Sequence, residues 1–128
     1  MKTSYPVVFT NTGSGYVASV PDMGIDTQGA DLTEAIAMAR DAIGIMGIDM
    51  EDEGKQLPQP SDPSVIAHEP GEIVSMVDID FTAYRRANEQ RTVRKNITLP
   101  SWLADAGEKA GVNFSAVLQK ALRQELQL

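Results

Sequence analysis

A short alternating stretch near the C-terminus, "RTVRKNITLP", most constrains what this chain can fold into. A β-strand places successive side chains on opposite faces. If residues 92–99 form a strand, one face is largely apolar and carries Val93, Lys95, Ile97 and Leu99. The opposite face carries three hydrogen-bonding side chains, Arg94, Asn96 and Thr98. The fold must therefore cover one side of this strand and leave the other available for polar contacts.

Two helical patterns follow Pro100. Ser101 is placed to cap the first helix, and Gly111 suits its end. Asn113 is placed to cap the second helix, whose apolar residues recur at spacings of three and four: Phe114, Val117, Leu118, Ala121, Leu122 and Leu126. A strand and two short helices, about 37 residues, are too few for an independent core. The simplest partner for this unit is a second copy of itself.

Two copies of the strand at 92–99 can pair antiparallel into a ribbon that fits the major groove of B-DNA. Arg bonds guanine there, Asn bonds adenine, and Thr serves either base, so we predict Arg94, Asn96 and Thr98 as base readers. Phosphates would bind at the N-terminus of the second helix, at Asn113, Phe114 and Ser115. The predicted dimer core consists of Val93, Ile97, Leu99, Trp102, Leu118 and Leu122.

The first 80 residues predict a separate unit with the order βββαβ. Its strands are "YPVVFTN", "YVASVPD", "GIDTQG" and "EIVSMVDID". Asp31 is a good N-cap for the helix, and Glu34 completes a capping-box pattern. The helix has an apolar stripe that we expect to cover one face of the sheet: Leu32, Ala35, Ile36, Ala39, Ile43 and Met46. Residues 81–91 read as a linker or a short helix, and the fold class is α+β.

Charge divides the chain in the same way. The net charge of the 128 residues is −7. Residues 1–80 hold 3 basic against 14 acidic side chains, a balance of −11, and the remainder holds 8 against 4, a balance of +4. This asymmetry predicts a cationic partner for the first part and a polyanion for the second. The alternative, that both are ordinary solvated surfaces, stays open.

Several other classes of protein find little support. The sequence has no run of about 18 apolar residues, so we expect no membrane span, and the apolar part of "MKTSYPVVFT" is too short for a signal peptide. Cysteine is absent, which excludes disulfides and thiolate metal sites and fits a reducing cytoplasm. "DMEDEG" begins like a calcium loop, but Pro60 stands where the bidentate Glu belongs. We predict no cofactor.

Catalytic and metal chemistry rest on few residues. His68 is the single histidine and lies in a loop by composition. Asp78 and Asp80 share one strand face and, with Asp26, could hold a divalent metal. We favour a solvated strand face near a partner-binding surface instead. The sequence therefore predicts no metal site and no enzymatic activity.

Two regions resemble a known family. "VRKNITLPSWLADAGEKAGVNFSAVLQKALRQEL" resembles a ribbon-helix-helix DNA-binding domain. "YPVVFTNTGSGYVASVPDMG", "TQGADLTEAIAMARDAI" and "GKQLPQPS" resemble the N-terminal domain of HicB-type antitoxins, although "PDMGI" is shorter than the usual "PDLPG" pattern. The resemblance implies a partial RNase H-like, toxin-binding domain at 1–80, a linker at 81–91 and a DNA-binding dimerisation domain at 92–128.

The resemblance also implies a function. Such an antitoxin would neutralise a HicA-type, mRNA-cleaving toxin and repress its own operon by binding operator DNA. The toxin would contact the acidic face of residues 1–80, the chain would form a homodimer, and pairing of dimers into a tetramer stays open. Two alternatives remain. One is a ribbon-helix-helix repressor whose first domain senses a ligand, and the other is a nuclease of RNase H type.

Overall fold

The computed structural model describes residues 1–88 and 92–128. The chain divides into two compact units, Met1–Gln90 and Arg91–Leu128. Residues 81–88, expected within a linker, form the helix α2 (Phe81–Asn88) and belong to the first unit. The rest of the expected linker, residues 89–91, lies outside the described residues.

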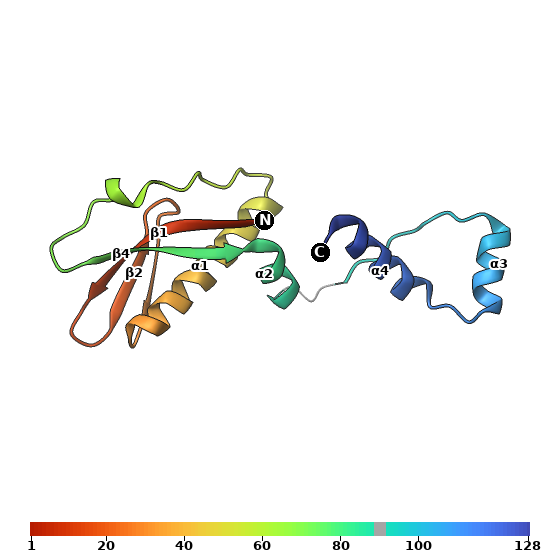
Figure 1. Ribbon diagram of the computed structural model, residues 1–128, viewed down its shortest axis with the longest axis horizontal. Helices are drawn as coiled ribbons and strands as arrows, with labels where there is room; N and C mark the ends of the chain where they lie inside the picture. Colours follow the sequence, from red (N-terminus) through yellow and green to blue (C-terminus); the bar gives the residue numbers. More distant parts are fainter. Residues whose placement is uncertain (89–91) are drawn as a thin grey trace. The chain divides into compact units, whose positions relative to one another are not determined.

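The first unit is built on a four-stranded sheet with the order β3-β2-β1-β4 (Figure 1). Its strands are β1 (Lys2–Asn11), β2 (Tyr16–Val20), β3 (Ile25–Gly29) and β4 (Ile73–Asp80). Each neighbouring pair is antiparallel. A single helix, α1 (Leu32–Asp52), separates β3 from β4 in the sequence. The α+β class and the expected order βββαβ are confirmed.

The pairing of β1 with β4 is fixed by its register. Met76 lies opposite Pro6, and the N–H of Phe81 donates to the carbonyl of Met1 at 3.0 Å. Residues of an antiparallel strand direct their backbone groups alternately to the two sides. Odd-numbered residues of β4 therefore bond β1, and Met76 and Pro6 form a non-hydrogen-bonded pair. The proline removes no bond from this ladder, which explains how a strand tolerates it.

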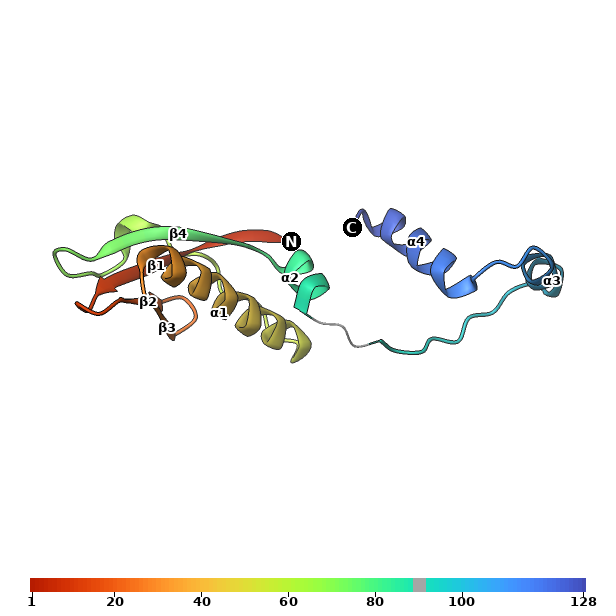
Figure 2. The same cartoon turned by 90° about the horizontal axis from the view of Figure 1, so that it is seen from below.

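Helix α1 packs across one face of the sheet (Figure 2). The Oδ1 atom of Asp31 accepts the N–H of Glu34 at 2.8 Å, so the predicted N-cap is confirmed. Ala35, Ala39 and Ile43 of the predicted stripe are fully buried. They pack against the buried sheet residues Tyr5, Val7, Phe9, Ala18, Val20, Val77 and Ile79. This face of the sheet and the stripe of α1 form the core.

Helix α2 packs on α1 where α1 carries glycines instead of side chains. A Cβ atom at Gly44 would lie 2.6 Å from the ring of Tyr84, and one at Gly47 would overlap the ring of Phe81. Phe81 is buried and belongs to the core cluster. The glycines thus form a notch that receives two aromatic rings, and α2 is an integral part of the first unit.

The proline-broken loop from 53 to 72 is tied to the sheet. The hydroxyl of Tyr5 donates to the carbonyl of Pro58 at 2.8 Å, and the N–H of Ser61 donates to Asp22 at 2.8 Å. A short 3₁₀ helix, η1 (Pro63–Val65), follows. A long loop needs such anchors because its backbone N–H and C=O groups do not form the regular hydrogen bonds of a helix or sheet.

The second unit contains α3 (Ser101–Lys109) and α4 (Phe114–Leu126). Asn113 caps α4 as expected, accepting the N–H of Ala116 at 3.0 Å. The N-cap of α3 is Pro100 and makes no side-chain bond, so the expected cap at Ser101 is wrong. Ser101 is instead the first helical residue.

Residues 92–100 have no regular secondary structure, although a strand was expected at 92–99. A strand requires a hydrogen-bonded neighbour, and the rest of this unit is helical. From 92 to 128, all of which the structure describes, each residue is exposed or half-buried. The unit therefore has no core within one chain.

Candidate functional site

An apolar groove opens on the second unit. It has a volume of about 360 Å³ and is lined by Ile97, Leu99, Leu103, Gly107, Val112, Phe114, Val117, Leu118 and Ala121. Three residues of the predicted dimer core, Ile97, Leu99 and Leu118, line it. Val93, Trp102 and Leu122 lie outside the lining and are exposed. So much exposed apolar surface in a unit of this size marks a contact surface.

The predicted base readers lie in the first part of the second unit, before α3. Arg94, Asn96 and Thr98 are all exposed. They are close in sequence to Ile97 and Leu99 of the groove. Covering the groove would therefore bring a partner next to these three polar side chains.

At the predicted phosphate site at the start of α4, the side chains of Asn113 and Ser115 already make hydrogen bonds within the helix. The amide oxygen of Asn113 accepts the N–H of Ala116, and the hydroxyl of Ser115 accepts a bond from Gln119 at 3.3 Å. The ring of Phe114 lies against Gly107, where a Cβ atom would come within 2.7 Å. Phe114 thus contributes its side chain to the groove, and only its backbone could serve an anion.

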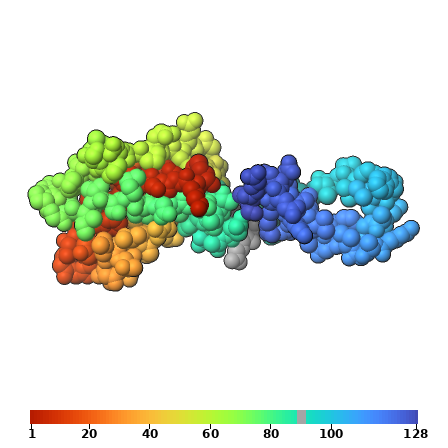
Figure 3. Space-filling view, in the orientation of Figure 1, coloured from red at the N-terminus to blue at the C-terminus, as the bar shows by residue number. Residues whose placement is uncertain are grey.

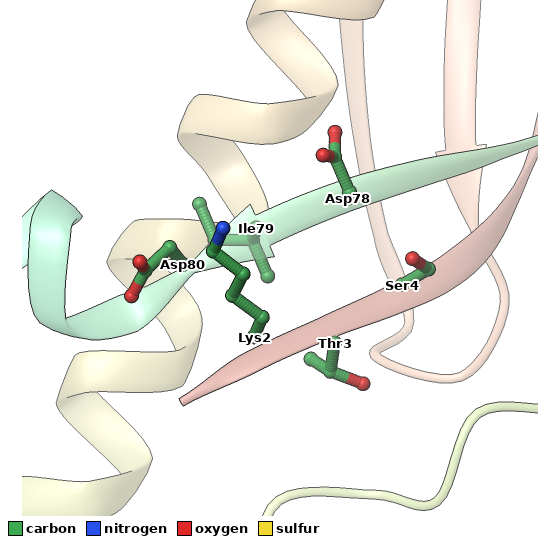
Figure 4. Close-up of a pocket in the computed structure, with 6 residues that line it drawn as sticks. All are labelled: Lys2, Thr3, Ser4, Asp78, Ile79 and Asp80. Atoms are coloured by element: carbon green, nitrogen blue, oxygen red, sulfur yellow. The ribbon is translucent and has the colours of Figure 1, made fainter.

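Acidic residues gather on β4 in the first unit. A surface hollow of about 300 Å³ is lined by Lys2, Thr3, Ser4, Asp78, Ile79 and Asp80. Figure 4 shows Lys2 and Ser4 on β1 beside Asp78 and Asp80 on β4. The side chain of Asp80 accepts the N–H groups of Ala83 and Thr82 at 3.2 and 3.1 Å, and so caps α2. These bonds, led by that from Ala83, lower the pKa of Asp80.

Asp78 is held differently. The guanidinium of Arg40 on α1 donates to its carboxylate at 3.0 Å and to its backbone carbonyl at 3.0 Å. The Asp78 side chain is nevertheless 80% exposed. Because the side chains of Arg40 and Asp78 are both exposed, both charges remain accessible to a partner. An exposed ion pair of this kind contributes little to the stability of the fold.

The arrangement of the sheet separates Asp26 from Asp78 and Asp80, the other two aspartates of the metal alternative. Asp26 lies on β3, and β2 and β1 stand between it and β4. Three interstrand spacings of about 4.8 Å each keep the carboxylates apart. Among the described residues, no three His, Asp or Glu side chains are grouped as metal ligands would be. His68 is exposed in its loop, with Nδ1 3.0 Å from the carbonyl of Ile66.

The contacts of α2 were not foreseen from the sequence. The hydroxyl of Tyr84 donates to Asp41 at 2.8 Å, and burial, reinforced by this bond, raises the pKa of Tyr84 to about 12. Arg85 bonds Asp52 at 2.9 Å. Gly44 and Gly47, three residues apart in a helix, were the available signal for a closely packed neighbour.

No helix in the described ranges 1–88 and 92–128 is long and apolar enough to cross a membrane.

Comparisons with known proteins agree over most of the chain. Residues 5–120 match the family model of the HicB-like antitoxin of bacterial toxin–antitoxin systems. A curated relative, an uncharacterized 14.9 kDa protein from the rep–hol intergenic region of Haemophilus phage HP1, is 32% identical over 103 residues, or 77% of this chain and 74% of the relative.

Two solved structures extend the likeness. One is a toxin–antitoxin complex from Streptococcus pneumoniae, with a TM-score of 0.60 and 28% identity, covering 98% of this chain and 99% of that one. The other is a HicA3 and HicB3 toxin–antitoxin complex, with a TM-score of 0.51 and 27% identity, covering 61% and 99% respectively. The likeness thus concerns both sequence and fold.

Proposed function

Because the chain belongs to the family of HicB-like antitoxins of bacterial toxin–antitoxin systems, we propose that it binds and neutralises a HicA-type toxin that cleaves mRNA. It also binds operator DNA and represses the operon that encodes both proteins. It acts through binding alone, with no catalytic activity of its own. Its two partners, an mRNA-cleaving protein and operator DNA, place both activities in the cytoplasm.

The observation that carries this proposal is the family match over residues 5–120, which spans both units. The related chain in the HicA3 and HicB3 complex supports a toxin as the partner. Charge supports the same assignment, because a protein that holds RNA phosphates must present basic groups. The surplus of acids in residues 1–80 complements such a surface.

The DNA-binding half of the proposal rests on the second unit. Its apolar groove and its lack of a core within one chain favour a homodimer, in which residues 92–99 of two copies pair as a ribbon. Arg94, Asn96 and Thr98 would then read bases, and the backbone of Phe114 and Ser115 at the start of α4 would bind a phosphate. The first unit would be the toxin-binding part, with a partial RNase H-like fold and no nuclease activity.

Co-expression tests the proposal. The full chain is produced with an affinity tag beside the product of the neighbouring short reading frame, in a variant of that product that no longer arrests growth. We expect the two proteins to co-purify, and the full chain to restore growth when the active form is expressed. A chain that neither retains the neighbouring protein nor restores growth would refute the toxin partner. Retardation of the operon's own promoter fragment tests the repressor role separately.

A further inference from the structure

Strand β4 is an edge of the sheet, since the strand order is β3-β2-β1-β4. Its odd-numbered residues bond β1, as the Phe81 to Met1 bond shows. The N–H and C=O groups of Val74, Met76 and Asp78 therefore point to the outer side, away from β1. The contact of Arg40 with the carbonyl of Asp78 agrees with this direction.

Most backbone groups on this outer edge make no hydrogen bond within the described residues. Within the part of the chain that the structure describes, the Arg40 guanidinium alone bonds the outer edge, at Asp78. The outward groups of Val74 and Met76 have no protein partner there. Atoms of β4 (green) also reach the surface of the first unit in Figure 3. A strand edge of this length with unpaired backbone groups is a template for a further strand.

We propose that the outer edge of β4 is the docking site of the toxin, which adds an extended basic segment there as a further strand of the sheet. This inference rests on the proposed function and specifies its contact surface. Main-chain bonds to Val74 and Met76 would supply affinity, and the side chains beside them would supply selectivity. The segment would take the place of Arg40 at the carbonyl of Asp78.

The side chains along β4 favour a basic occupant. Asp78 is 80% exposed, and Asp80 lies on the same strand face. Met76 and Ile73 are also exposed and can contact the aliphatic stems of Lys and Arg. A segment with positive charges opposite Asp78 and Asp80 therefore pairs by both charge and apolar contact.

A second copy of this chain is a poorer occupant. The balance of −11 over residues 1–80 makes two such units repel each other. The negative charge of the first unit therefore favours a basic toxin over a second copy of this chain at the β4 edge.

Proline at position 76 tests the inference. Because the N–H of Met76 points away from β1, Met76→Pro preserves the ladder with β1 but removes an outward donor and places a ring on the edge. Met76→Ala is the matched control, since it removes the same side chain and keeps the N–H. Binding of each full-length variant to the inactive neighbouring toxin is measured by calorimetry, with thermal unfolding of the free variants as a check of folding.

We expect the proline variant to bind at least about tenfold more weakly than the alanine variant. Equal affinities of two folded variants, with wild type binding normally, would overturn the β4 inference and leave the proposed function intact. A wild-type chain that does not bind the toxin would overturn both. A change in self-association without a change in toxin affinity would instead identify a contact between copies, and would also overturn the inference.

Hydrogen exchange of the wild-type chain gives an independent readout if the proline variant fails to fold. The outward amides of Val74 and Met76 should exchange rapidly in the free chain and slowly in the complex. The amides of Val77 and Ile79, which bond β1, serve as internal controls and should be slow in both. Unprotected amides at Val74 and Met76 in the complex would overturn the inference.

Discussion

The ring of Phe81 occupies the space that a side chain at Gly47 would need. This relationship joins α2 to α1 and places Phe81 in the core. The first unit consequently extends through α2, and a boundary at residue 80 would remove a buried aromatic residue from it. Any dissection of the chain must respect this contact.

Replacement of Gly47 by Ala should destabilise the first unit. Overlap with the buried Phe81 ring costs about 1–3 kcal/mol, while Ala gains about 1 kcal/mol of helix propensity over Gly. We expect a net loss of stability, because the ring has little room to move. Urea unfolding of the full chain, followed by circular dichroism, measures it. Met38→Ala, on the exposed side of α1, should leave the midpoint nearly unchanged, and an equally unchanged midpoint for Gly47→Ala would contradict the packing described.

Tyr84 should make the stability of the chain sensitive to alkaline pH. Its folded-state pKa is raised from 10.0 to about 12. The raised pKa means that the folded state favours the protonated phenol of Tyr84, which adds to the free energy of unfolding. This stabilisation is fully present below pH 10 and is lost as the pH rises toward 12. Tyr84→Phe removes the titrating group. Unfolding midpoints of both proteins between pH 9 and 12 test this, and a parallel decline in the two would exclude Tyr84 as a cause.

Much of the first unit was predictable because its signals are local. Asp31 and Glu34 mark the start of α1, and the spacing of Ala35, Ala39 and Ile43 identifies its buried side. These features depend on neighbours within a turn or two of helix. Local patterns were therefore sufficient for the order βββαβ.

The remaining features depend on partners distant in sequence. Gly44 and Gly47 acquire meaning only when Tyr84 and Phe81 pack on them. The open edge of β4 follows from the strand order, which no local pattern specifies. The strand expected at 92–99 requires a neighbouring strand that one chain does not supply. Long-range pairing, within the chain or between chains, is the information that the sequence patterns lacked.

Asn96 offers a direct test of base reading. Asn96→Ala removes an exposed side chain and should leave folding intact. It should weaken operator binding by about 1–3 kcal/mol for each bidentate pair of hydrogen bonds to a base that the substitution removes. A gel-shift titration with the operon's promoter measures the effect. Gln59→Ala, which removes an exposed amide from the first unit, is the control, and equal affinities for the two variants would rule out Asn96 as a base reader.

The central claim, that toxin neutralisation and DNA binding lie in separate units, is tested most directly by a fragment of residues 1–88. This fragment retains the sheet, α1 and the buried Phe81 of α2. It lacks residues 92–99, α3 and α4. Its binding to the inactive neighbouring toxin is compared with that of the full chain, after circular dichroism has established that it folds. We predict equal toxin affinity and no retardation of promoter DNA. A folded fragment that cannot bind the toxin would show that neutralisation requires the second unit, and would contradict the account.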